Sequence, residues 1–490
     1  MTRLVWYRND LRLRHAGLRD ALDSGEAVRA LYLLCPGQWD RHGVAEARRW
    51  YVLESLRELG RGLARRGVPL DVIDAGTFEH CPEVLADYVQ HHGIQAVHCS
   101  REYPLNEKRR DQAVADRLTV LGVAIHGRDE TMLVPPQALR TGQGTPYTVF
   151  TPYSRAWHKM LDRAPPLPEQ PPRTATPAGF PGEAMIDDAL GQLRVPDSVR
   201  RAWPPGEAAA QRRLTDFLEK GLQPYGSRRD DPDKAGTSRL SAALSAGTLA
   251  PADAWWRARQ TADGSTGAAA WINELAWRDF YRQIMALFPR LSRGEAFQPV
   301  DRMLSWNTDE TLWRAWCEGR TGYPLVDAGM RQLMHQGWMH NRLRMVTAMF
   351  LSKHLMIDWR RGERFFMEHL VDGDFAANNG GWQWSASVGT DAVPYFRVFN
   401  PVRQSRRFDP QGHFIARYVP ELAHLDADSI HEPWKAPMLA PNYPVPIVAH
   451  QGVRDRVAER FRLRCPCPRS VRSRCRRGRG RGPRSSRRRP

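Results

Sequence analysis

The sequence predicts two domains, an α/β domain at the N-terminus built on a doubly wound parallel sheet and an all-α domain at the C-terminus. In the first 130 residues, short apolar runs alternate with amphipathic stretches, which is typical of a parallel sheet covered by helices. Residues 205–400 instead carry long helical patterns with almost no strand alternation. A segment dense in proline and glycine lies between the two regions and marks a domain boundary.

The first domain, residues 1–130, has four apolar runs that predict strands. They cover residues 4–13, 27–35, 69–73 and 96–100, and the amphipathic stretches 45–65 and 106–121 predict helices between them. The first strand is not followed by the G-x-G-x-x-G turn of dinucleotide-binding folds, and the chain has no G-x-x-x-x-G-K-[ST] loop. We therefore expect this domain to bind neither NAD nor ATP.

Residues 131–204 predict an extended linker, because sequences such as APPLPEQPPRTATPAGFPG cannot continue a helix. The helical domain is expected at 205–455, with helices at 209–221, 268–288, 309–318, 324–336, 338–356 and 361–370. We expect the arginine-rich tail, 464–490, to be disordered. This tail is either a nucleic-acid-binding arm or a seam such as a shifted reading frame. Its abrupt composition favours the seam, and mass spectrometry of the native protein would distinguish the two.

The formal charge at pH 7 is +18, but the tail holds 12 arginines and no acidic residue, so the remaining chain carries only +6. No run of 18 or more apolar residues exists and the N-terminus is charged from its start, which argues against a membrane span and a signal peptide. The seven cysteines are scattered and lack paired metal-ligand spacing. We therefore expect reduced thiols in a cytoplasmic protein without a metal site.

The predicted helix 271–288 has two unlike faces. Its core face carries Ala276, Phe280, Ile284 and Leu287, and its opposite face carries Glu274, Trp277, Arg278 and Tyr281. A carboxylate, a guanidinium and two aromatic rings suit a pocket for a planar, hydrogen-bonding, anionic ligand. The alternative, which is the commoner one for a lone helix, is a solvated amphipathic helix.

Two further segments carry polar residues of interest. In helix 338–350, Asn341 and Met345 lie one turn apart, flanked by Arg342 and Arg344. An amide can recognise a base edge and arginine can hold phosphate, although such a helix is more often simply packed with its arginines outside. In GTSRLS, residues 236–241, the hydroxyls lie at a predicted helix start, which suits a diphosphate but is also common helix capping.

The stretch VDGDFAANNGGWQW, residues 371–384, combines acidic, amide and glycine residues. Asp372 and Asp374 flank Gly373, and two asparagines and two glycines follow before the tryptophans. Such a density of small and amide residues indicates backbone that lies close to a ligand. The two aspartates alone are a weak metal signature, because no third or fourth ligand follows at a suitable spacing.

Together these blocks resemble the DNA photolyase/cryptochrome family. The blocks are LVWYRNDLRL, GTSRLS with Tyr225 twelve residues before Thr237, WINELAWRDFYR, TGYPLVDAGMRQL, GWMHNRLRM and DGDFAANNGGWQWSASVGTDAVPYFRVFNP. The resemblance spans residues 1–450 and is closest to the bacterial class I enzymes that repair cyclobutane pyrimidine dimers. It implies an α/β domain joined to a helical domain that binds one FAD.

The resemblance also implies which residues contact FAD. By matched position they are Tyr225, Thr237, Ser238, Arg239, Leu240, Ser241, Trp271, Arg278, Arg344, Asp372, Gly373, Asp374 and Asn378. Asn378 would face flavin N5, where an amide accepts a hydrogen bond but does not itself exchange protons near neutral pH.

The implied reaction is light-driven repair, in which photoexcited reduced FAD passes one electron to a dimer flipped out of the DNA. The implied catalytic residues are Glu274, Trp277, Asn341, Met345 and Asn378. The implied DNA contacts are Glu274, Trp277, Arg278, Tyr281, Asn341, Arg342, Trp384 and Arg397. Related enzymes for the six-four photoproduct carry histidine at the positions of Asn341 and Met345. Neither residue is histidine here, which favours the cyclobutane dimer. We expect a monomer that binds damaged DNA, single- or double-stranded, without sequence preference.

Three more expectations follow from the resemblance. Trp382, Trp359 and Trp306 match the electron-transfer chain that reduces resting flavin. CPGQW, residues 35–39, with Asn106 and Glu107 resembles the surface that holds a methenyltetrahydrofolate antenna, with an exposed loop and a capped helix as the alternative. The alternative function is a cryptochrome-type blue-light photoreceptor without repair activity, against which the dimer-pocket residues argue.

Overall fold

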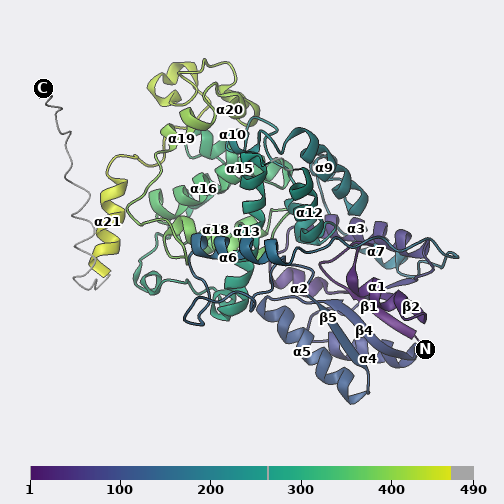
Figure 1. The fold of residues 1–490 in the computed structure, drawn as a ribbon. Coiled ribbons are helices and arrows are strands. Elements are labelled where there is room, and N and C mark those ends of the chain that lie inside the picture. The colour runs from purple at the N-terminus through teal and green to yellow at the C-terminus, as the bar shows by residue number, and fades with distance from the viewer. Residues whose placement is uncertain (1, 262–263, 465–490) are drawn as a thin grey trace, which may run out of the picture.

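The computed structural model describes residues 2–261 and 264–464, so the predicted tail at 465–490 lies outside the described residues (Figure 1). A five-stranded parallel sheet forms the N-terminal half, with the strand order β3-β2-β1-β4-β5. Its strands are β1 (Thr2–Tyr7), β2 (Ala27–Leu34), β3 (Leu70–Asp74), β4 (Ile94–Ser100) and β5 (Ala124–Arg128). The order reverses between β1 and β4, which is the arrangement of a doubly wound sheet.

Helices cover both faces of this sheet. They are α1 (Ala16–Asp23), α2 (Pro36–Arg41), α3 (Glu46–Ala64), α4 (Cys81–His91) and α5 (Leu105–Val120). Val5 and Tyr7 pack in one core with α3, whereas Leu4 and Trp6 pack in another with α4 and α5. The alternation of side chains along β1 therefore buries both faces, which confirms the predicted α/β fold.

Two sequence expectations for this sheet are wrong. The first strand, expected over 4–13, ends at Tyr7, because the chain then turns and Arg12 donates to the carbonyl of Gly247 in the helical half at 3.0 Å. The edge strand β5 was not expected, since it carries no apolar run and alternates only between exposed and half-buried residues.

The expected extended linker is wrong for much of residues 131–204, because this segment contains three helices. They are α6 (Phe150–Arg163), α7 (Glu183–Gly191) and α8 (Asp197–Ala202). Tyr153 and Trp157 of α6 are buried in the core of the helical half, and Ile186 of α7 is buried against the sheet. Residues 131–149 and the proline-rich stretch 164–181 are free of helix. The domain boundaries at 130, 204 and 455 stay predictions.

The C-terminal half is helical, as predicted. Its α-helices are α9 (Gly206–Lys220), α10 (Tyr225–Arg228), α11 (Ser241–Ala246), α12 (Pro251–Thr261), α13 (Thr266–Leu287), α14 (Glu310–Cys317), α15 (Pro324–Gln336), α16 (Asn341–Met349), α17 (Trp359–Met367), α18 (Phe375–Ala386), α19 (Pro401–Phe408), α20 (His413–Tyr418) and α21 (Val453–Arg464). Short 3-10 turns are η1 (Pro289–Arg293), η2 (Pro299–Met303), η4 (Pro420–Leu422), η5 (Pro433–Lys435) and η6 (Pro437–Leu439), and η3 (Phe350–His354) is a π-helix. The expected helix 338–356 is thus α16 followed by η3, and it begins at Asn341 because the His340 side chain caps it.

Helix α13 lies at the centre of the helical half beside α6 and α18 (Figure 1). Ser265 caps its N-terminus by accepting from the Ala268 amide at 3.2 Å. Ala276, Phe280 and Ile284 are buried as expected, whereas Leu287 is only half-buried. A Cβ at Gly380 of α18 would lie 2.1 Å from Cδ1 of Tyr281, so glycine lets α13 and α18 pack closely. Among the described helices, none is long and apolar enough to cross a bilayer.

Candidate active site

Both aspartates of the segment 372–374 are bound by arginines. The buried Asp372 accepts two hydrogen bonds from Nη2 of Arg344, at 2.8 and 3.0 Å. Asp374 caps α18 through the Ala377 amide at 3.0 Å and pairs with Arg282 at 2.6 Å. Burial opposes ionisation of Asp374, but the neighbouring guanidiniums hold its pKa well below the ordinary value. The two carboxylates therefore hold Arg344 and Arg282 in place. Among the described residues, no three or more His, Cys, Asp or Glu side chains gather as a metal site would require.

The arginines form a cationic cluster around the two carboxylates. Arg278 donates to the carbonyls of Thr131 and Leu244 at 2.8 and 3.1 Å, and burial together with Arg282 lowers its pKa to about 9. Arg48 reaches the cluster from α3 and donates to Ser245 at 2.6 Å. Arg278 thus lies in this cluster with its guanidinium on two backbone carbonyls, and both its expected cofactor contact and its expected DNA contact stay predictions. Sequence reasoning missed Arg282, although it lies one helical turn after Arg278.

The GTSRLS segment lies in front of α11, whose first residue is Ser241. Thr237 and Ser238 therefore precede the helix rather than occupying its first turn, and Leu240 is the N-cap. Arg239 adopts a positive φ of 50°, a conformation that non-glycine residues rarely hold without a functional reason. Its guanidinium lies over Trp203 and Trp338, 4.8 and 4.9 Å from their ring centres. Trp338 Nε1 donates to Ser241 Oγ at 3.4 Å.

An aromatic wall closes another side of the expected cofactor site. Tyr225 and Trp271 are buried and both contact the ring of Phe217, with centroid distances of 5.9 and 5.3 Å. A planar ring system would lie against such a wall without exposing apolar surface to water.

These residues fit a large anionic cofactor. Two buried donors, Arg239 Nε and Trp382 Nε1, have no hydrogen-bond partner among the described residues, and a ligand would supply acceptors for them. A Cβ at Gly381 would meet nothing within 4 Å, so open space lies beside Asn378. Cationic groups, free donors and open space therefore occur at the positions expected for FAD.

The Asn378 side chain is oriented by α17. Its Nδ2 donates to the carbonyl of Glu363 at 2.9 Å, which fixes which end of the amide is the acceptor. The neighbouring Asn379 donates to the Glu363 carboxyl at 2.8 Å and accepts from Gln383 at 2.8 Å. Burial raises the pKa of Glu363 to about 7. Sequence reasoning missed Glu363, because it lies on a different helix from the amides that it contacts.

Glu274 forms an ion pair with Arg229, which sequence reasoning also missed. Burial raises the pKa of Glu274 in spite of this guanidinium. Arg342 pairs with Asp230 at 2.7 Å, and its Nη1 lies 3.8 Å from Met345 Sδ. Asn341 is exposed at the start of α16.

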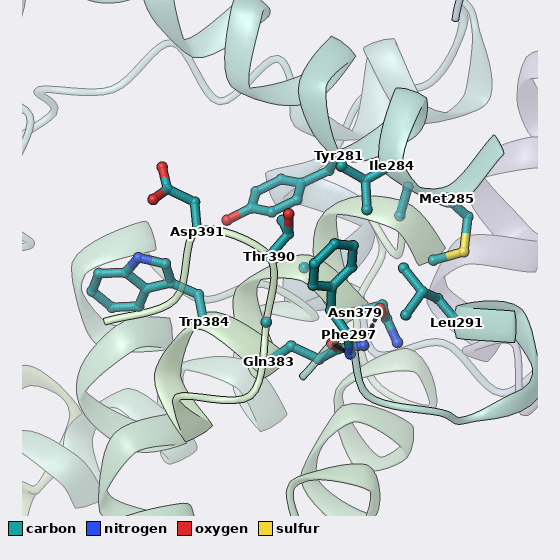
Figure 2. A pocket seen from close by; sticks show the side chains of 13 residues that line it. Tyr281, Ile284, Met285, Leu291, Phe297, Asn379, Gln383, Trp384, Thr390 and Asp391 are labelled. Carbon is teal, nitrogen blue, oxygen red and sulfur yellow. Dashed lines mark hydrogen bonds between the residues drawn. The ribbon is translucent and has the colours of Figure 1, made fainter. Parts of the chain in front are cut away.

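Trp277 lies in a stack of aromatic rings. Its indole is parallel to Phe150 of α6 with a centroid distance of 3.5 Å, and Tyr281 lies 5.5 Å away on the following turn. Tyr281 and Trp384 line one pocket together with Thr390 and Asp391 (Figure 2). The structure therefore brings Trp277, Tyr281 and Trp384 together, and Arg397 is exposed on the loop that leaves this pocket.

The three tryptophans expected to conduct electrons lie on adjoining elements. Trp382 is buried on α18 against Gly362 of α17, where a Cβ would lie 2.1 Å from the indole. Trp359 is buried at the start of α17 and donates to Asp301 at 3.0 Å. Trp306 is half-buried. The next residue, Asn307, forms an isolated β-bridge with Ile357, two residues before Trp359. Trp382 and Trp359 are thus buried, and Trp306, the last in the predicted order, is the most exposed of the three.

The predicted antenna residues lie between α2 and α5. Residues 35–39 start the short helix α2, so the exposed-loop alternative is wrong for them. Asn106 Nδ2 lies 3.1 Å from Nε2 of His42, which joins the two helices. Burial and then Glu102 raise the pKa of Glu107 to about 7. Pro104 occupies the N-cap position of α5, but no side chain makes a capping hydrogen bond there. The alternative of a capped helix start therefore does not account for the presence of Glu107.

Known proteins match this chain over nearly its whole length. Residues 3–173 match the family described as DNA photolyase, and residues 271–463 match the FAD binding domain of DNA photolyase. The deoxyribodipyrimidine photo-lyase of Salmonella typhimurium is 41% identical over 477 residues, covering 92% of this chain and 97% of the relative.

Two solved structures share the fold. A bacterial class III photolyase from Agrobacterium tumefaciens has a TM-score of 0.86 and 34% identity, covering 94% of this chain and 97% of that chain. A cryptochrome from Synechocystis has a TM-score of 0.80 and 27% identity, covering 94% and 98%. By these matches, the chain belongs to the DNA photolyase family.

Proposed function

We propose that this protein is a light-driven lyase that repairs cyclobutane pyrimidine dimers in DNA. The observation that carries this proposal is the position of Glu274 and Trp277 on one turn of α13, which also packs on the helix that bears Asn378. Bound FAD supplies the light-excited electron that opens the dimer. The residues of the chain bind the dimer, orient it and stabilise the charge that it receives.

Glu274 is the group that recognises the dimer edge. Its carboxyl hydrogen-bonds the pyrimidine edge and stabilises the negative charge that the dimer receives. A bound dimer competes with Arg229 for this carboxyl, because the two are paired in the free protein. Trp277 lies beside Phe150 and Tyr281, and its indole stacks on the dimer. Asn341 and Met345 complete the wall.

The cofactor is held by residues from several segments of the helical half. Asp372, Gly373 and Asp374 contact its ring and adenine side, and residues 237–241 with Tyr225 contact its phosphates and sugar chain. Trp271, Arg278 and Arg344 complete the pocket. Asn378 accepts a hydrogen bond at flavin N5 through Oδ1, since Glu363 engages its Nδ2.

The partner is damaged DNA, single- or double-stranded, bound by a cytoplasmic monomer without sequence preference. Arg342 and Arg397 contact phosphates, while the ease of flipping the lesion supplies discrimination. Trp382, Trp359 and Trp306 conduct electrons to resting flavin. A methenyltetrahydrofolate between α2 and α5 acts as the antenna, with Asn106 and Glu107 at its pterin.

The test compares light and dark. Purified protein with chemically reduced flavin is mixed with an oligonucleotide that contains one thymine dimer and is illuminated with blue light. We expect the intact thymines to reappear only in the light. A protein that retains FAD but restores no thymine would be a cryptochrome-type photoreceptor, the function that similarity to the Synechocystis cryptochrome favours.

A further inference from the structure

Lys353 is a buried cation that the proposed repair mechanism does not use. Only 2% of its surface is exposed, and it lies in η3, the π-helix that follows α16. Burying an ammonium group is unfavourable unless it meets a specific partner, and π-helical turns often occur at functional sites. The position of this lysine therefore requires an explanation.

The partner of Lys353 is a backbone carbonyl. Its Nζ donates to the oxygen of Arg397 at 2.9 Å, and within residues 2–261 and 264–464 no carboxylate pairs with it. Burial, and then the charge of Arg397, lower its pKa to about 7. The contact therefore tethers the main chain at Arg397 while leaving the Arg397 side chain exposed.

The tethered residue belongs to a loop with two anchored ends. At its start, Thr390 donates to the carbonyl of Thr148 at 2.7 Å, and Asp391 accepts from the Phe150 amide at 2.9 Å. At its end, the Phe399 amide contacts Met349 Sδ at 3.3 Å beside the Lys353 contact. The beginning of the loop lines the pocket of Figure 2.

We propose that Lys353 is a positioning residue that fixes loop 392–399 so that Arg397 meets a phosphate of the damaged DNA. This inference rests on the proposed function, because it requires the protein to bind a DNA lesion. A preordered loop binds without first losing conformational freedom, and anionic phosphate beside Arg397 stabilises the buried ammonium. Lys353 contacts neither Glu274 nor Trp277, so it affects binding and leaves the repair step unchanged.

The test separates affinity from turnover. Lys353→Met keeps the length of the side chain but removes its donor, whereas Lys353→Arg keeps a donor. We expect Lys353→Met to weaken binding of dimer-containing DNA about tenfold, and Lys353→Arg to restore most of this loss. Repair yield at saturating DNA and the flavin spectrum should not change. The control is Lys435→Met, which removes an exposed lysine paired with Glu432 at 3.0 Å and should bind as wild type.

A double-mutant cycle tests whether Lys353 acts through Arg397. In an Arg397→Ala background, Lys353→Met should weaken binding no further. Additive losses would overturn the inference, as would wild-type affinity of Lys353→Met. If Lys353→Met does not fold, Met349→Leu loosens the same loop end at nearly constant volume. That variant should also weaken binding, and wild-type affinity would overturn the inference. Failure of the wild type to repair would instead overturn the proposed function.

Discussion

The buried carboxyl of Glu363 makes the stability of this protein depend on pH. Burial raises its pKa from the ordinary 4.5 to about 7, because the loss of water outweighs what the ionised form gains from the Asn379 amide and the charge of Arg360. The folded state therefore binds this proton more tightly than the unfolded chain does. The resulting stability is fully present below pH 4.5 and is lost as the pH rises through 7.

Glu363→Gln removes this titration while keeping an oxygen that accepts from Asn379. With one pKa unit equal to 1.36 kcal/mol, the wild type should lose about 2.5 kcal/mol relative to the variant between pH 5 and pH 8.5. Urea unfolding, followed by tryptophan fluorescence at both pH values, measures this difference. Flavin binding should be unaffected, since Asn378 contacts the backbone of Glu363 and not its carboxyl.

The matched control is Glu368→Gln, which alters a carboxyl on the exposed surface next to α17 that pairs with Arg364 at 2.9 Å. Its effect should stay within about 0.5 kcal/mol at both pH values. The reasoning is refuted if Glu363→Gln changes the free energy of unfolding by the same amount at pH 5 and at pH 8.5.

Three further predictions concern the cofactors. Trp382→Phe should abolish photoreduction of oxidised flavin, because it removes the buried first member of the electron-transfer chain. Transient absorption measures this photoreduction, and rapid photoreduction in the variant would contradict the prediction. Asp372→Asn should weaken FAD binding about tenfold, since Arg344 loses its buried charge partner. Equilibrium dialysis measures this affinity, and Asp216→Asn on α9 is the exposed control. Glu107→Ala should remove the near-ultraviolet band of methenyltetrahydrofolate that the protein retains after the folate is added. The exposed control Glu83→Ala should keep this band. An unchanged band in Glu107→Ala would exclude this antenna site.

Local sequence patterns predicted the helices that carry the site more reliably than the contacts within it. The stripe of Ala276, Phe280 and Ile284 follows from the helical period, and α13 buries it as expected. Helix α6 carries a comparable signal, with Phe150, Tyr153, Trp157 and Leu161 buried at helical spacing. The proline- and glycine-rich sequences on both sides of α6 hide this signal, because their composition predicts an extended chain for the whole segment.

The partners in the site could not be predicted from spacing. Arg229 meets Glu274 across 45 residues, and Arg282 meets Asp374 across 92. Such pairs depend on how helices pack, which a period within one helix does not report. The family resemblance supplied residue roles that composition and spacing left open, and these roles stay predictions until variants are tested.

The most direct test of the account is the quantum yield of dimer repair with chemically reduced flavin, measured in parallel for wild type, Glu274→Ala and Trp382→Phe. The account places Glu274 at the dimer and Trp382 on the separate route that only prepares the flavin. It predicts a yield several-fold lower for Glu274→Ala, with FAD still bound, and a wild-type yield for Trp382→Phe. An unchanged yield in Glu274→Ala, or a lost yield in Trp382→Phe with reduced flavin, would contradict it.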